Sequence, residues 1–223
     1  MKKKEIYATL LVIALLAIDQ IIKIWVKTHM ALGDQIVIAP WFRIDFIENR
    51  GMAWGMQFGS KFGLSLFRII AVGFLAWYIH SQIAKKAKTG YVVLLCMICA
   101  GAAGNIFDSI FYGQIFTAST PWSVSQLVPW GQGYDTSLLG GSVVDMFYFP
   151  IIHGTFPSWF PLWGGEEFTF FNAIFNFADA CITMGVLCLI IFYWKYLSNN
   201  GEEPSATTQK PQPSEANETS EKQ

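Results

Sequence analysis

Two aspartates in apolar surroundings are the residues of this sequence best suited to chemistry. Asp145 follows a Gly-Gly segment, and Asp179 lies in an apolar stretch with no basic residue within one helical turn. Two carboxyl groups held close together cannot both ionise at low cost, so they share a proton. The charged member can then take a proton from water while the neutral member hydrogen-bonds a substrate carbonyl. Such a pair predicts hydrolysis that needs neither a metal ion nor a cofactor.

Further polar residues occur in pairs at helical spacing. Asp19 and Lys23 are four residues apart, the spacing of an ion pair on one helix face. Asn105 and Asp108 are three residues apart, as are Asn176 and Asp179, so each pair also shares a helix face. An ionisable residue inside a membrane costs roughly 2.5–3.5 kcal/mol and by default marks a functional site. A structural role, as an ion pair or as polar contacts between helices, is the alternative for the first two pairs.

The elements that must position these residues are membrane spans. Of the 223 residues, 53% are apolar and only 14% are charged, whereas soluble proteins carry about 25% charged residues. This composition excludes a nucleic-acid-binding protein. A bilayer core needs about 20 apolar residues as helix. Four stretches meet this requirement: residues 6–26, 63–83, 91–112 and 174–197. The sequence therefore predicts an all-α membrane protein of four transmembrane helices.

The basic residues predict the orientation of these spans. Lys2, Lys3 and Lys4 precede the first span, and three further lysines lie between the second and third spans. Residues 113–172 contain no Lys or Arg at all. Because cytoplasmic loops are enriched in Lys and Arg, we expect both termini in the cytoplasm and both long loops outside. All the polar pairs then lie at the outer ends of their helices, in one shallow layer.

The loops and the tail have distinct compositions. Apolar and polar residues alternate from Phe42 to Phe46, which predicts a short strand in the first loop. Residues 156–175 of the second loop are rich in aromatic residues, which favour the headgroup level of a membrane. Residues 198–223 contain no aromatic residue and are rich in polar residues, so we expect a disordered cytoplasmic tail.

Five motifs in this order resemble those of the lipoprotein signal peptidases (signal peptidase II). Each motif alone is weak, but the five together, spread over residues 19–179, are highly specific. They are Asp19-Gln-Ile-Ile-Lys23, Asn49-Arg50-Gly51-Met-Ala-Trp54-Gly55, Gly104-Asn105-Ile-Phe-Asp108, Val143-Val144-Asp145-Met146 and Phe175-Asn176-Phe-Ala178-Asp179.

The resemblance implies a role for each of these residues. In the family the aspartates of the last two motifs are catalytic, which here are Asp145 and Asp179. The remaining motif residues would bind substrate or support the site; they are Asn49, Gly51, Asn105, Asp108, Asn176, Asp19 and Lys23. The reaction implied is removal of the signal peptide from diacylglyceryl-modified prolipoproteins, on the amino side of the lipidated Cys. The enzyme would be a monomer in the bacterial inner membrane, in contact with membrane lipids, with its active site near the outer face.

Two departures from the family pattern occur. An Arg usually follows the aspartate of the third motif, but Ser109 stands here, and Arg50 and Arg68 are candidates to replace it. The segment between Asp108 and Asp145 is also longer than usual, with an outward insertion at about residues 112–139. This insertion could form a lid over the site, a partner surface or a neutral loop.

Two functions of other classes remain as alternatives. A small ion or proton transporter would use Asp19, Asp108 and Asp179 as a relay. However, such a relay needs polar groups through the whole membrane depth, and residues 6–17 are almost wholly apolar. A non-catalytic assembly protein would use the same residues only as contacts between helices. It would tolerate Asp→Asn changes that a peptidase would not.

Overall fold

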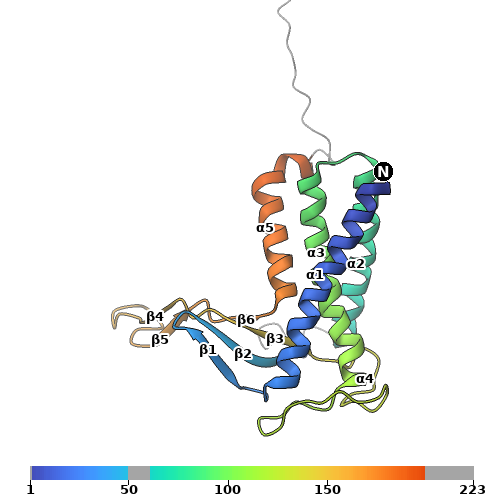
Figure 1. Cartoon of the computed structure of the whole chain (residues 1–223). Helices are drawn as coiled ribbons and strands as arrows, with labels where there is room; N and C mark the ends of the chain where they lie inside the picture. Colours follow the sequence, from blue (N-terminus) through green and yellow to red (C-terminus); the bar gives the residue numbers. More distant parts are fainter. Residues whose placement is uncertain (1, 50–60, 199–223) are drawn as a thin grey trace, which may run out of the picture.

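The computed structural model describes residues 2–49 and 61–198. Within this part the chain forms a bundle of four long helices with β-structure at one end (Figure 1). All four helices are long and apolar enough to cross a membrane. A π-helical turn, η1 (Asp108–Tyr112), and the short helix α4 (Gly113–Ile115) continue the third of them. The long helices are α1 (Lys2–His29), α2 (Lys61–Ala84), α3 (Thr89–Phe107) and α5 (Phe177–Ser198).

The strands form two separate antiparallel sheets. The four-stranded sheet has the order β1-β2-β3-β6, and β4 pairs with β5 alone among the described strands. The first sheet combines both long loops, because β2 from the first loop pairs with β3 from the second. The strands are β1 (Gln35–Ala39), β2 (Phe42–Asn49), β3 (Val143–Tyr148), β4 (Ile152–Thr155), β5 (Glu167–Phe170) and β6 (Ile174–Phe175).

Helix α1 buries its polar face and exposes its apolar face. Asp19, Gln20, Lys23 and Lys27 are all buried at helical spacing. Ile6, Leu10, Ile13, Ile21 and other large apolar side chains of the same helix are exposed. This pattern is the reverse of a water-soluble helix, and it fits a helix whose outer surface contacts lipid.

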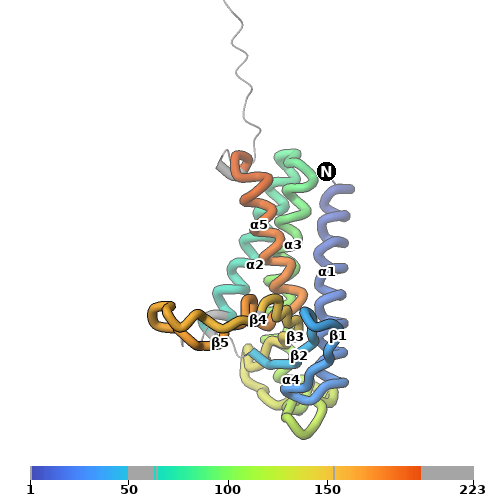
Figure 2. The backbone as a smooth tube through the Cα atoms, turned by 90° about the vertical axis from the view of Figure 1, so that its left-hand side faces the viewer, coloured from blue at the N-terminus to red at the C-terminus, as the bar shows by residue number. Residues whose placement is uncertain are grey.

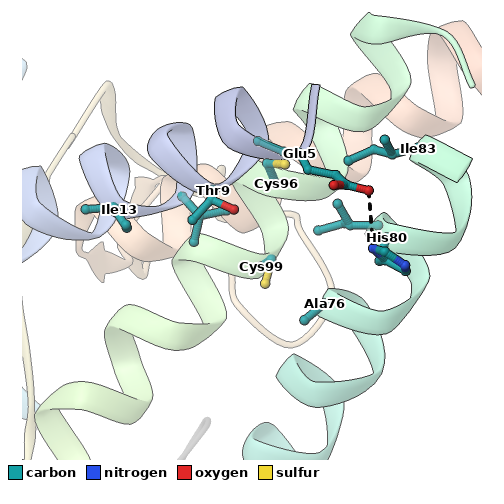
Figure 3. A pocket seen from close by; sticks show the side chains of 11 residues that line it. Glu5, Thr9, Ile13, Ala76, His80, Ile83, Cys96 and Cys99 are labelled. Atoms are coloured by element: carbon teal, nitrogen blue, oxygen red, sulfur yellow. Dashed lines mark ion pairs between the residues drawn. The ribbon is translucent and has the colours of Figure 1, made fainter. Parts of the chain in front are cut away.

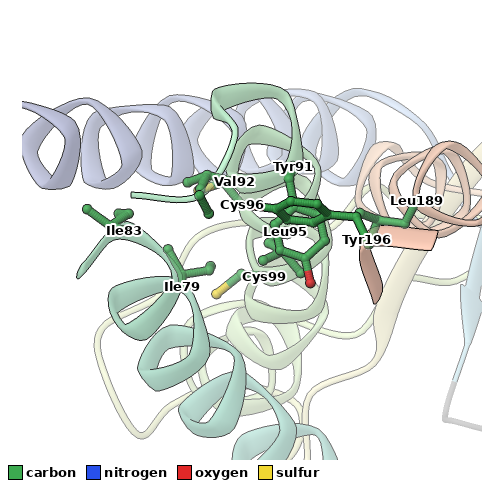
Figure 4. Packing of buried hydrophobic residues seen from close by; sticks show 10 residues of the cluster. Ile79, Ile83, Tyr91, Val92, Leu95, Cys96, Cys99, Leu189 and Tyr196 are labelled. Atoms are coloured by element: carbon green, nitrogen blue, oxygen red, sulfur yellow. The ribbon is translucent and has the colours of Figure 1, made fainter. Parts of the chain in front are cut away.

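Helix α3 lies at the centre and packs against α1, α2 and α5 (Figures 1 and 2). Gly101 and Gly104 permit this close approach. A Cβ atom at Gly104 would lie 2.6 Å from Asp19 Oδ2, and one at Gly101 would collide with the carbonyl oxygen of Ala178. At the end of the bundle away from the sheets, an apolar core surrounds Tyr91, which packs against Tyr196 and Leu95 (Figures 1 and 4).

The predicted helices and the predicted strand around Phe42–Phe46 are found, with two corrections. The fourth helix begins at Phe177 rather than at residue 174, because Ile174 and Phe175 pair with β3 as strand β6. Strands also form in the second loop and not only in the first, since β3 completes a sheet that β1 and β2 could not make alone. Of the predicted disordered tail, residues 198–223, Ser198 is the last residue of α5, and residues 199–223 lie outside the described residues.

Candidate active site

Asp145 and Asp179 come from different elements and are joined through two asparagines. Asp145 lies on β3 and is 3% exposed, while Asp179 lies in the first turn of α5 and is half-buried. Asn176 Nδ2 donates to Asp145 Oδ1 at 2.7 Å, and Asn105 Nδ2 donates to Asp179 Oδ1 at 2.8 Å. Asn176 Nδ2 also lies 3.2 Å from Asn105 Oδ1. A continuous chain of hydrogen bonds therefore connects the two carboxyl groups.

Asn176 holds Asp179 in place by capping helix α5. Its Oδ1 accepts a hydrogen bond from the backbone N–H of Asp179 at 2.9 Å, which is the geometry of a helix N-cap. Because its Nδ2 donates to Asp145, one amide group fixes both the start of α5 and the carboxyl group on β3.

Lys23 is a fully buried cation behind the asparagines. Its Nζ lies 3.0 Å from Asp19 Oδ2, 2.8 Å from Asp108 Oδ2 and 2.9 Å from Asn105 Oδ1. The contact with Asn105 matters for the site because it directs the amide oxygen toward Lys23. The amide nitrogen is then directed toward Asp179, where only a donor can bind a carboxylate.

Asp19 and Asp108 form hydrogen bonds to the two elements that carry Asp179 and Asp145. Asp19 Oδ1 accepts from the backbone N–H of Ala178 at 3.0 Å, in the first turn of α5. Asp108 Oδ2 accepts from the backbone N–H of Val144 at 3.3 Å, on β3. Each aspartate thus contacts Lys23 and also accepts a hydrogen bond from the backbone next to a candidate catalytic residue.

Burial and, after it, the negative charge of Asp179 raise the pKa of Asp145 to about 7. Hydrogen bonds from Asn176 and Asn49 and the charge of Lys23 oppose this shift and limit it. A carboxyl group with a pKa near neutrality can hold a proton beside a second carboxyl group. Together the two groups are equipped to act as a general acid and a general base.

The comparison with protein families agrees with this geometry. The model of the signal peptidase (SPase) II family matches residues 11–195. This chain belongs to the signal peptidase II family. A lipoprotein signal peptidase of Porphyromonas gingivalis is 50% identical over 208 residues, which cover 91% of each chain. One of Amoebophilus asiaticus is 37% identical over 189 residues, covering 80% of this chain and 75% of its own.

Solved structures support the fold of this signal peptidase II family member. A bacterial membrane enzyme structure determined by the in meso method at 2.3 Å resolution has a TM-score of 0.56 at 24% identity. The match covers 89% of this chain and 93% of the other. A second structure, determined by the same method at 1.9 Å, has a TM-score of 0.54 at 23% identity and covers 83% and 90%.

Of the residues predicted from the sequence, the structure brings eight together and leaves one undescribed. The hydrogen bonds and ion pairs above join Asp145, Asp179, Asn49, Asn105, Asp108, Asn176, Asp19 and Lys23. Gly51 and Arg50 lie outside the described residues. Ser109 is buried, and its Oγ donates to the carbonyl oxygen of Asn105 at 3.0 Å. Arg68 is half-buried on α2, and its role in place of the family Arg stays a prediction.

Two residues of the polar core were missed by sequence reasoning. Gln20 Nε2 donates to Asp108 Oδ1 at 2.9 Å and to Asp19 Oδ2 at 3.0 Å. Its Oε1 accepts from the hydroxyl of Tyr112 at 3.0 Å. Gln20 is adjacent to Asp19 and three residues before Lys23, so its place on the same helix face was an available signal.

The inserted segment lies behind the strand that carries Asp145. Neighbouring residues of a strand face opposite sides of the sheet, so Val144 and its partner Glu48 face away from the Asp145 side. On that far side Val144 and Met146 are fully buried in a cluster that includes Phe116 of the insertion. This placement disagrees with the hypothesis of a lid over the carboxyl groups, because the segment packs against the other face.

A buried ion pair attaches the insertion to the rest of the protein. Lys27 is 0% exposed and pairs with Glu48, and its Nζ lies 3.0 Å from Ser119 Oγ. Ser119 in turn donates to Glu48 Oε1 at 2.7 Å. The Lys27 ammonium also lies 5.4 Å and 5.1 Å from the ring centroids of Phe116 and Tyr134.

We expect Glu48→Ala to destabilise the protein by about 3 kcal/mol or more, because it leaves the buried Lys27 without its carboxylate. Ser119→Ala is the matched control, since it removes the hydroxyl group but leaves the Lys27–Glu48 ion pair, and it should cost less, about 1.5–2 kcal/mol. Thermal unfolding in detergent measures both changes. A lid would give the opposite pattern, in which stability is kept and KM for substrate changes.

A cavity in the bundle is separate from the carboxyl groups. It has a volume of about 240 Å³ and lies between α1, α2 and α3, where Glu5 Oε1 is 3.7 Å from His80 Nδ1 (Figure 3). Glu5 precedes Asp19 by fourteen residues, about 20 Å along α1. The cavity walls are mostly apolar, and no group of three or more metal-ligating side chains occurs in the described parts of the chain.

Proposed function

We propose that this enzyme removes the signal peptide from prolipoproteins and cuts on the amino side of a diacylglyceryl-modified Cys. Membership of the signal peptidase II family and the lipoprotein signal peptidases among its relatives support this activity. The observation that carries the mechanism is the chain of hydrogen bonds from Asp145 through Asn176 and Asn105 to Asp179. It links two carboxyl groups of different environment through two side-chain amides.

In this mechanism Asp179 is the general base and Asp145 holds the shared proton. Asp179 takes a proton from water, and the water oxygen adds to the carbonyl carbon of the scissile bond. Asp145 gives its proton to the carbonyl oxygen, which yields a tetrahedral diol. The diol collapses as the C–N bond breaks: the leaving nitrogen takes the proton that Asp179 now holds, and Asp145 takes back a proton from a diol hydroxyl, which restores the starting state. Burial of Asp145 favours its neutral form and so supports this assignment.

The proposed location is the bacterial cytoplasmic membrane, with both termini in the cytoplasm and the active site near the outer face. The start of α1, the turn between α2 and α3, and the end of α5 lie at one end of the bundle (Figure 1). Lys2, Lys3, Lys4, Lys85, Lys86 and Lys88 belong to this end. The polar layer and the sheet lie at the other end, where a lipid-modified Cys would present its peptide bond. Because one chain supplies both carboxyl groups, we propose that a monomer is active.

We expect kcat/KM to fall as the pH rises through about 7. Below that pH Asp145 keeps its proton, and above it Asp145 has lost this proton and no longer supplies an acid for the carbonyl oxygen. Cleavage rates at substrate concentrations well below KM, between about pH 5 and 9, measure this limb. A constant kcat/KM across the pKa of Asp145 would contradict the assignment of Asp145 as the acid.

The experiment that tests the proposed function uses purified enzyme and a synthetic prolipoprotein with a diacylglyceryl group on its Cys. Mass spectrometry identifies the bond that is cut. The matched control is the same precursor without the lipid. We expect cleavage before the lipidated Cys and little or no cleavage of the control. Folded enzyme that cuts neither precursor, or that cuts both equally, would contradict the proposal.

A further inference from the structure

The hairpin formed by β4 and β5 stands apart from the rest of the protein. Its two strands pair only with each other among the described strands, from Ile152 opposite Phe170 to Thr155 opposite Glu167. Figures 1 and 2 show it projecting sideways from the bundle, at the height where α5 begins. A bilayer crossed by the helices would have its interface at this height.

The hairpin exposes large apolar side chains along its whole length. The exposed fractions are 89% for Leu162, 77% for Trp159 and 50% for Trp163. Ile151, Ile152, Phe170 and Phe171 are also exposed, at the other end of the hairpin. Soluble monomers rarely present large contiguous apolar patches without a function in binding, so this surface requires a partner.

An aromatic cluster and a backbone hydrogen bond order the tip of the hairpin. Phe156 stacks on Phe160 and packs against Phe168, with ring centroids 5.0 Å and 4.7 Å apart. The backbone closes around this cluster, since Gly165 N–H donates to the carbonyl oxygen of Phe156 at 2.9 Å. The aromatic cluster thus gives the exposed Trp159 and Leu162 a rigid base.

The charges of this region indicate which partner fits. Residues 113–172 contain no Lys or Arg, and the hairpin carries Glu166 and Glu167, both exposed. Attraction to acidic lipid headgroups or to an acidic peptide is therefore absent. Binding must come from the apolar and aromatic side chains, and Trp in particular favours the membrane–water interface.

We propose that the β4–β5 hairpin inserts its apolar side chains into the bilayer interface beside the bundle. The lipid-facing side of α5 continues this surface, since Met184, Leu187 and Ile191 are exposed along it. The partner is the lipid interface of the leaflet at the sheet end. This inference does not depend on the proposed peptidase activity.

Insertion of the hairpin would hold the strand carrying Asp145 at a fixed depth. The segment entering the hairpin passes through Phe149, whose ring stacks on that of Phe175 with centroids 5.7 Å apart. The ring of Phe175 also contacts that of Phe147 on β3, with centroids 6.1 Å apart. The segment leaving it passes through Phe171, which contacts Phe175 at 5.9 Å. Both ends of the hairpin are therefore coupled to the sheet next to the carboxyl groups.

The experiment places a nitroxide spin label at residue 162, through Leu162→Cys, in protein reconstituted into phosphatidylcholine nanodiscs. Gln132→Cys, at an exposed position of the insertion, is the matched control. Three of the four native cysteines are buried and one is half-buried, so unsubstituted protein gives the background of labelling. Leu162 is almost fully exposed, so its replacement is not expected to disturb folding.

We expect the label at residue 162 to collide severalfold more often with oxygen, and severalfold less often with an aqueous nickel complex, than the label at residue 132. Equal accessibility to the nickel complex would overturn the proposal. Protection at residue 162 that rises with the number of chains per nanodisc would identify a second copy as the partner instead. Protection that begins only when a prolipoprotein is added would identify the substrate, and would equally overturn it.

Discussion

Replacing Asp145 or Asp179 by asparagine is expected to reduce kcat by about 10⁴-fold or more, while the protein stays folded. Each carboxyl group has a role that an amide cannot perform, because asparagine neither gives up a proton to the carbonyl oxygen nor takes one from water. The structural contacts survive the change. An amide oxygen at residue 145 still accepts from Asn176 Nδ2, and one at residue 179 still accepts from Asn105 Nδ2.

The measurement compares cleavage of the lipidated precursor with thermal unfolding for wild type and both variants. Because Asp145 is buried, a neutral amide there should leave the unfolding temperature unchanged or raise it. Retained cleavage in either variant would remove that residue from the catalytic pair. Retained cleavage in both would favour an assembly role for the polar cluster, which needs only hydrogen bonds.

Replacing Lys23 by methionine is expected to destabilise the protein by about 3–5 kcal/mol. The change leaves Asp19 and Asp108 buried, without the cation that lies 3.0 Å and 2.8 Å from their carboxyl oxygens. It also frees the amide of Asn105 to rotate, so activity should fall even in the fraction that folds. Thermal unfolding in detergent and cleavage rates per folded molecule separate the two effects.

A triple variant tests whether the unpaired carboxylates cause this loss of stability. Lys23→Met combined with Asp19→Asn and Asp108→Asn removes both unpaired carboxylates, and we expect it to recover much of the lost stability. The amide oxygens can still accept from Ala178 and Val144. If the single variant is as stable as wild type, the buried ion pairs do not determine the stability of the bundle.

Helices and candidate site residues could be predicted because both have strong local signals. A run of about 20 apolar residues predicts a membrane span. Charged residues within such runs are rare, so each one is a candidate site residue. The start of the fourth helix was predicted three residues too early. Asn176 is a favourable N-cap residue, but Ile174 and Phe175 before it are as apolar as the helix that follows.

The long-range pairing could not be read from local patterns. Strand β3 is buried on both faces, so Val143 to Met146 show no alternation that marks a strand. The insertion packs on one face of the sheet, and which face this is depends on the pairing of Glu48 with Val144. These two residues belong to different loops, about a hundred residues apart in sequence. Most residues of the polar core were predicted, but Gln20 and Tyr112 were not, and the roles of Asn105 and Asn176 as bridges became visible only in the structure.

The inverted polarity of α1 also bears on how the protein assembles. Before α3 and α5 are in place, the first helix must enter lipid with Asp19 and Lys23 already in its sequence. Their spacing lets each neutralise the other within the isolated helix, so this pair adds no net charge to the span that enters lipid. Once α3 arrives, Asp108 and Asn105 bind the same ammonium group. Lys23, the cation at the centre of the polar core, thus also provides the polar contacts through which α1 associates with α3.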